Sequence, residues 1–294
     1  MSRLDTDEDE IEASRAPLMD HLIELRGRLV VCVVAFVIAF LVCFYFAAPI
    51  QLILIHPFQV ASALHAAAGP SGHSASPFDL IEATAWLKPL PTGGEPVALI
   101  STAPLEQLFT KMKIAGFGGV VLAFPVLAWQ LYRFVAPGLY RNEKGAFLPF
   151  LLASPVLFSL GAALVYFVML PFVMWFSLNQ QVVGDGVSVA LLPKISEYLN
   201  LVTALLLAFG LCFQLPIVMT LLGLAGIISS KVMAEGRRYA IMAVVVVAAI
   251  VTPPDPISQI MLAVPLVLLY EISIWCVRLI EFRRKKADAA EGLA

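Results

Sequence analysis

Ionisable side chains gather at the borders of long apolar stretches in this sequence, and they carry most of its possible chemistry. His21, Glu24 and Arg28 precede the apolar run that begins at Leu29, and their spacing places them on one face of a helix. Glu143 stands just before another apolar run. Because carboxylates bind guanidinium groups through paired hydrogen bonds, Glu24 and Glu143 together would form a receptor for arginine side chains.

A structural interpretation of the same residues stays open. The leucines within 22–29 would form the apolar stripe of an interfacial helix, which Arg26 and Arg28 would anchor at the membrane surface. An acidic residue at Glu143 would also stabilise the positive end of the helix that follows it. The residues alone therefore predict either an anchor or a receptor.

Polar residues within the apolar runs form a second group of candidates. Gln214 lies near the middle of one run, where an amide side chain is typically bonded to a neighbouring helix. Glu271 lies in the last run, and a carboxylate in that position needs a partner or must be neutral. Asp255 and Gln259 mark the polar turn that precedes this last run.

The composition is that of a membrane protein. Hydrophobic residues make up 60% of the 294 and charged residues 14%, whereas soluble domains have about 45–50% and 25%. The mean hydropathy is +0.90. A formal net charge of −2 does not fit the basic surface of a nucleic-acid-binding domain. We expect an all-α integral membrane protein with no nucleic-acid partner.

Motifs for several kinds of chemistry are missing. The sequence contains no phosphate-binding glycine loop, no zinc-binding pattern of histidines or cysteines, and no nucleophile elbow. The four cysteines all fall in apolar runs, where they are typical of helix packing. We therefore expect no enzymatic activity, no cofactor and no metal site.

Six apolar segments are predicted to cross the membrane, which takes about 20 helical residues. They cover residues 29–48, 113–132, 147–176, 198–222, 239–252 and 257–277. They form one membrane domain, 29–280, which follows a cytoplasmic segment, 1–28, that contains an amphipathic helix, and precedes a cytoplasmic tail, 281–294. The long loop 49–110 would lie outside. The fifth span covers only about 21 Å as a helix, so we expect a thinner bilayer beside it.

The distribution of basic residues predicts the orientation. If both termini are inside, the inner segments hold 15 of the 19 lysines and arginines. Because inner loops of membrane proteins are enriched in lysine and arginine, both termini are predicted to be cytoplasmic.

Four motifs in this order resemble the TatC family, the receptor subunit of the twin-arginine protein translocase. They read HLIELRGRL at 21–29, FPVLAWQLYRFVAPGLYRNE at 124–143, AFGLCFQLP at 208–216 and TPPDPISQ at 252–259. The resemblance covers about residues 20–280. It implies a cupped bundle of six helices in the bacterial inner membrane that binds signal peptides with consecutive arginines at its cytoplasmic face. Folded proteins would then be exported with energy from the proton-motive force.

The resemblance also implies roles for particular residues and partners. Positions that correspond to the signal-peptide site are Glu24, Arg26, Phe134, Pro137, Leu139 and Glu143. Pro57 resembles a structural proline of the outer segment, and Gln214 would face the concave side of the bundle. Residues 244–249 resemble the docking face for a single-span TatB-type subunit. TatA-type subunits would join later, and several copies of this chain would assemble in the complex.

The sequence also departs from the family, and other function classes stay open. The outer linker 62–96 is longer than the family pattern, the acidic stretch 5–12 matches no motif, and Gln214 cannot titrate. A secondary transporter would show a repeat and a midplane site, and it would take up solute without a partner. A membrane enzyme would depend on the pair His21 and Glu24.

Overall fold

Nearly all of the described chain is helical. A computed structural model describes residues 3–68, 77–85, 99–135, 144–180, 182–184, 187–189, 193–224, 226–251 and 256–291. The helices are α1 (Arg3–Tyr45), α2 (Ala47–Ala68), α3 (Pro77–Thr84), α4 (Glu106–Val135), α5 (Lys144–Leu164), a π-helical turn (Val165–Met169), α6 (Leu170–Asn179), α7 (Ile195–Cys212), α8 (Leu215–Leu224), α9 (Ser230–Glu235), α10 (Arg237–Val251) and α11 (Pro256–Glu291). A hairpin of β1 (Val182–Gly184) and β2 (Val187–Val189) completes the fold.

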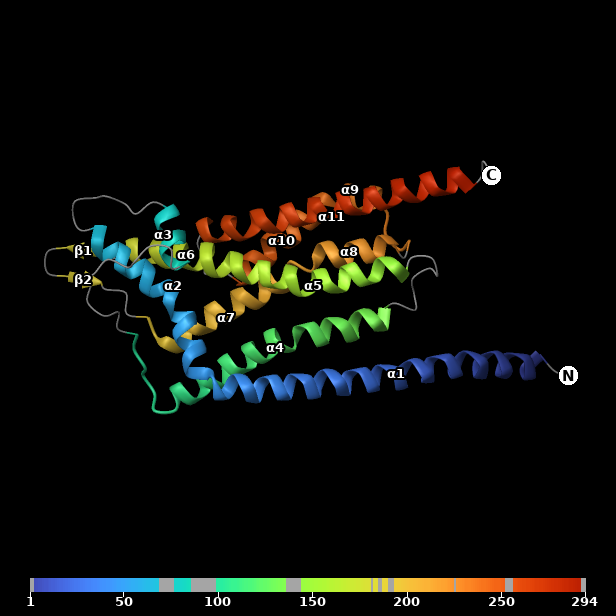
Figure 1. Cartoon of the computed structure of the whole chain (residues 1–294), viewed down its shortest axis with the longest axis horizontal. Coiled ribbons are helices and arrows are strands. Elements are labelled where there is room, and N and C mark those ends of the chain that lie inside the picture. The colour runs from blue at the N-terminus through green and yellow to red at the C-terminus, as the bar shows by residue number, and fades with distance from the viewer. Residues whose placement is uncertain are drawn as a thin grey trace.

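The long helices follow from the apolar runs, because a helix satisfies every backbone hydrogen bond within itself where no water is available. Six helical stretches are long and apolar enough to cross a membrane: Ile23–Tyr45, Ala47–Ala66, Glu106–Arg133, Leu152–Asn179, Ile195–Leu224 and Gln259–Arg283. Residues 3–28 are part of the continuous helix α1 rather than a separate helix. The N- and C-termini lie at the same end of the bundle (Figure 1).

The set of six includes α2 and omits α10, whereas the sequence favours α10 as the fifth span. Length explains the omission, because the 15 residues of α10 cover only about 22 Å. Figure 1 shows that α1 ends, and α4 begins, at the same end of the bundle, and that α2 crosses that end obliquely. The chain therefore leaves and re-enters the bundle on one side between these two helices.

Close packing joins α1 to α4. A Cβ atom built on Gly119 would lie 3.1 Å from the Cα of Phe40, and one built on Gly118 would lie 2.8 Å from Cys43 Sγ. Glycine is needed at both positions because the two helices approach so closely. Most of the rest of α1 is exposed, with only 11% of its apolar span buried, so its outer surface must face lipid or another chain.

The core lies where α2, α6 and α7 meet. Phe58, Val165, Leu205 and Phe209 are almost fully buried there. One feature escaped the sequence analysis: the predicted fourth span is broken at Phe213 and Gln214, between α7 and α8. Pro216 contributes to the break, because it has no backbone N–H for the hydrogen bond that would continue α7 into α8.

Candidate functional site

Glu24 lies on α1 beside the last turns of α4. Arg28, one turn further along α1, donates from Nε to the Oε1 atom of Glu24 at 3.1 Å and also bonds the same oxygen through Nη2. Its Nη1 atom lies 3.5 Å from the backbone oxygen of Gln130 on α4. The pair thus fixes the Glu24 carboxylate next to the end of α4, while 42% of that side chain stays exposed.

Most of the other residues expected in the signal-peptide site follow Gln130 in the sequence. Phe134 is part of the last turn of α4, one turn after Gln130, although its side chain lies outside the described part. Pro137, Leu139 and Glu143 also lie outside the described residues. Figure 1 shows that α4 ends and α5 begins at the end of the bundle that carries both termini.

Arg26 differs from Arg28 in its surroundings. Arg26 is exposed, whereas the side chain of Arg28 is only 16% exposed because it lies between Glu24 and α4. A carboxylate has two oxygens and about four sites for hydrogen bonds, so a carboxylate of this kind can bond more than one guanidinium. An exposed carboxylate is chemically suited to bind a guanidinium group.

Gln214 has both ends of its amide satisfied inside the bundle. Its Oε1 atom accepts a hydrogen bond from Ser154 Oγ at 2.8 Å, and its Nε2 atom donates to the backbone oxygen of Ser154 at 2.9 Å. The hydroxyl of Tyr132 lies 3.5 Å from the same Oε1 atom. Gln214 therefore joins the break between α7 and α8 to α5 and α4, and its side chain is buried.

Glu271 is paired with Arg237, the first residue of α10. The two carboxylate oxygens accept from Nε and Nη2 of Arg237, each at 2.8 Å, in the bidentate geometry that suits a guanidinium. The pair is partly exposed, with 33% of the Glu271 side chain accessible. Glu271 therefore has a charged partner on the neighbouring helix.

Pro57 and Gln259 lie at the opposite side of the bundle, on α2 and α11. Pro57 is buried inside α2. Gln259, in the first turn of α11, donates to the backbone oxygen of Val245 on α10 at 3.3 Å and so joins the last two helices. Asp255 lies outside the described residues.

Glu106 is a structural centre that the sequence analysis missed. Its Oε2 atom accepts from the backbone amides of Thr102 and Ala103 at 2.6 and 3.2 Å. Its Oε1 atom accepts from Ser196 Oγ on α7 at 2.5 Å. A Ser-Thr pair shortly before a glutamate and an apolar run is close to a capping-box pattern, which could have indicated the local bonds but not the contact with α7.

Comparisons with known proteins agree on one family. The family model described as Sec-independent protein translocase protein (TatC) matches residues 20–265. A TatC protein of Magnetococcus marinus is 39% identical over 94% of this chain and 89% of its own length. The Aquifex aeolicus TatC protein is 36% identical over 93% of this chain and 100% of its own length. The Escherichia coli TatC protein is 33% identical over 88% of this chain and 87% of its own length.

A solved structure is also similar to this chain. The crystal structure of a twin-arginine translocase receptor, TatC, superposes with a TM-score of 0.68 at 35% identity and covers 88% of this chain and 98% of its own. The likeness confirms the all-α membrane fold expected from the sequence.

Proposed function

Because this chain belongs to the TatC family of Sec-independent protein translocase proteins, we propose that it receives twin-arginine signal peptides at the end of the bundle that carries Glu24. The chain is a multi-pass membrane subunit of a protein translocase. The observation that carries the proposal is the exposed Glu24 carboxylate, which Arg28 holds beside α4.

The site would combine Glu24 with the segment that joins α4 to α5. Gln130 contacts Arg28, and Phe134 follows one helical turn later, so Glu24 lies beside the end of α4 after which the segment with Glu143 follows in the chain. Two carboxylates at one surface suit two neighbouring guanidinium groups, each of which presents a planar fork of donors. Lysine is a point charge without this fork and would bind less well.

The same proposal implies an orientation of the bundle and the membrane in which it lies. Both termini lie at the end of Glu24, and most lysines and arginines fall on segments assigned to that side. We infer that this end faces the cytoplasm of a bacterial inner membrane. The helix α2 and the turn between α10 and α11 would then lie at the outer side.

Partner subunits would bind the membrane-facing surfaces of the bundle. Val245, Val246 and Ile250 on α10 are exposed although they are apolar, which suits contact with the single helix of a TatB-type subunit. TatA-type subunits would join that assembly, and α1 offers a second exposed apolar surface for another copy of this chain. The proposed role is binding and assembly, and the proton-motive force rather than a reaction on this chain would drive transport.

Site-specific photocrosslinking in inverted membrane vesicles tests the receptor role. A photoreactive residue at position 24, 134 or 143 should crosslink to a signal peptide with an Arg-Arg pair and much less to its Lys-Lys twin. Position 197 is the matched control, because Glu197 is exposed in the first turn of α7, and α7 begins at the opposite end of the bundle (Figure 1). Equal crosslinking of the two peptides, or crosslinks at 197 as strong as at 24, would contradict the proposal.

A further inference from the structure

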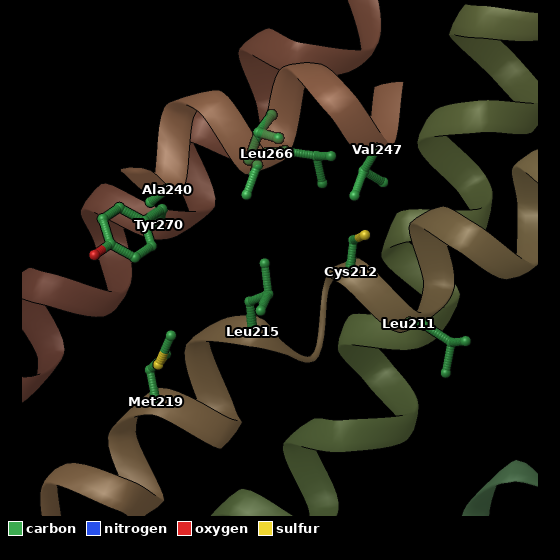
Figure 2. A pocket seen from close by; sticks show the side chains of 10 residues that line it. Leu211, Cys212, Leu215, Met219, Ala240, Val247, Leu266 and Tyr270 are labelled. Atoms are coloured by element: carbon green, nitrogen blue, oxygen red, sulfur yellow. The ribbon is translucent and has the colours of Figure 1, made fainter. Parts of the chain in front are cut away.

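An apolar cavity of about 410 Å³ lies on one side of the break between α7 and α8. Figure 2 shows side chains of α7 and α8 on one wall and of α10 and α11 on the other. The lining includes Cys212, Leu215, Ala240, Val247, Leu266 and Tyr270. The cavity lies outside the Glu24 site and the Gln214 network.

The walls offer nothing that would hold water. The hydroxyl of Tyr270 is turned away from the cavity and donates to the backbone oxygen of Met233 at 2.9 Å. A buried water needs two to four polar partners, so water is not a stable occupant here. The rim is open, because 55% of Leu211 and 39% of Val247 are exposed, and in a membrane this rim meets hydrocarbon chains.

Charged side chains lie at one end of the cavity. The cavity face of α10 follows a helical stripe from Ala240 to Val247, about 10 Å along the axis, and Arg237 lies one turn before it. Arg237 uses Nε and Nη2 to pair with Glu271, which leaves the donors on Nη1 for another anion. The charged residues beside this end are Arg237 and its partner Glu271, the exposed Arg238, and Glu235 two residues before Arg237.

We propose that this cavity binds one acyl chain of an anionic phospholipid, whose phosphate lies at Arg237 and Arg238. At about 30 Å³ for each water-sized group, the volume holds a chain of roughly a dozen methylene groups. A partner helix is about 10 Å wide with its side chains and does not fit inside the cavity. The Nη1 donors of Arg237 and the exposed guanidinium of Arg238 would bind a negatively charged headgroup.

Lipid retention by the intact purified protein tests this site. Native mass spectrometry after exchange into detergent should find one phosphatidylglycerol retained at least about tenfold more than phosphatidylcholine with the same acyl chains. Ala240→Phe, which fills the cavity, should abolish this preference. Ala249→Phe is the matched control, because Ala249 is exposed on the opposite face of α10. Arg238→Gln should reduce retention of phosphatidylglycerol severalfold and leave phosphatidylcholine unchanged.

A second measurement does not depend on a bulky substitution. In a variant that keeps only Cys212 of the four cysteines, phosphatidylglycerol should slow alkylation of the thiol by a membrane-permeant maleimide, and phosphatidylcholine should not. Equal retention of the two lipids, or retention by Ala240→Phe at the level of Ala249→Phe, would overturn the proposal. Protection of Cys212 by a single-span partner but not by phosphatidylglycerol would assign the cavity to that partner and equally overturn it.

Discussion

At the scale of single residues, the chain uses its rare polar groups in two different ways. Glu24 stays exposed beside α4, where a ligand can reach it, whereas Gln214 is buried with its amide bonded to Ser154. The sequence marks both residues as candidates by type and position. It does not predict that Gln214 bonds Ser154, or that Arg28, the partner of Glu24, contacts Gln130, because these residues are distant in the sequence.

Charge reversal at position 143 should be more harmful than neutralisation. Glu143→Gln removes one pairing with the signal peptide, and Glu143→Lys adds repulsion of an arginine, so its affinity should fall about tenfold further. Titration of vesicles with a labelled Arg-Arg peptide measures both. Wild-type affinity of the lysine variant would count against the site.

The two carboxylates should also act together. If Glu24 and Glu143 hold one pair of arginines, the losses from Glu24→Gln and Glu143→Gln should not add in the double variant, with a coupling of about 0.5–3 kcal/mol. The same titration gives the four affinities of this cycle. Strictly additive losses would assign separate roles to the two residues.

Replacement of Gln214 should loosen the bundle. Gln214→Leu leaves the hydroxyl of Ser154 without its amide partner, and we expect a loss of about 1 kcal/mol, typical of hydrogen bonds between helices in membranes. Thermal unfolding in detergent checks this, with Gln107→Leu as the control because Gln107 is exposed on α4. Equal melting temperatures of the two variants would argue against the network.

At the scale of elements, the apolar runs predict most helices but not how they are joined. The short helix α10, expected at 239–252, is found at Arg237–Val251. Its end was predictable because the prolines that follow lack the backbone N–H that would continue a helix. The break after α7 needed more than a pattern, since Pro216 alone also fits a continuous kinked helix. Glu106 was missed because its bond to Ser196 joins segments that are distant in the sequence.

The first turns of α4 and α7, which Glu106 joins, should separate if Glu106 loses its charge. Glu106→Gln weakens the bonds from Ser196 and from the amides of Thr102 and Ala103, so hydrogen exchange at these two amides should become faster. Glu197→Gln is the matched control, because that exposed carboxylate at the same end pairs with neighbouring Lys194. Unchanged exchange in the Glu106 variant would contradict this role.

The pair that joins α10 to α11 should tolerate exchange of its charges. Arg237→Glu or Glu271→Arg alone places like charges together, whereas the double exchange restores attraction and should recover most of a loss of about 0.5–1 kcal/mol, since the pair is half exposed. Thermal unfolding of the three variants gives the comparison. A double variant less stable than either single one would show that bidentate geometry matters more than charge.

At the scale of the whole molecule, the family and the six-span class follow from composition and motif order, whereas the choice between α2 and α10 as a span depends on their arrangement in space. A cysteine at Gln59, exposed on α2, should react with a membrane-impermeant maleimide from outside intact cells. A cysteine at Arg26 should react only in inverted vesicles. The opposite pattern would reverse the proposed orientation.

Because α1 is unbroken, a displacement at Glu24 would also move the N-terminus of this helix. Its 43 residues form a rod about 65 Å long, which packs tightly against α4 at Phe40 and Cys43. Glu24 lies about 24 Å along the rod from Phe40, so a tilt of about ten degrees at this fulcrum shifts Glu24 by about 4 Å. A ligand that draws Arg28 away from Gln130 would thus tilt α1. The N-terminus would move more than Glu24, because it lies farther from Phe40 along the helix.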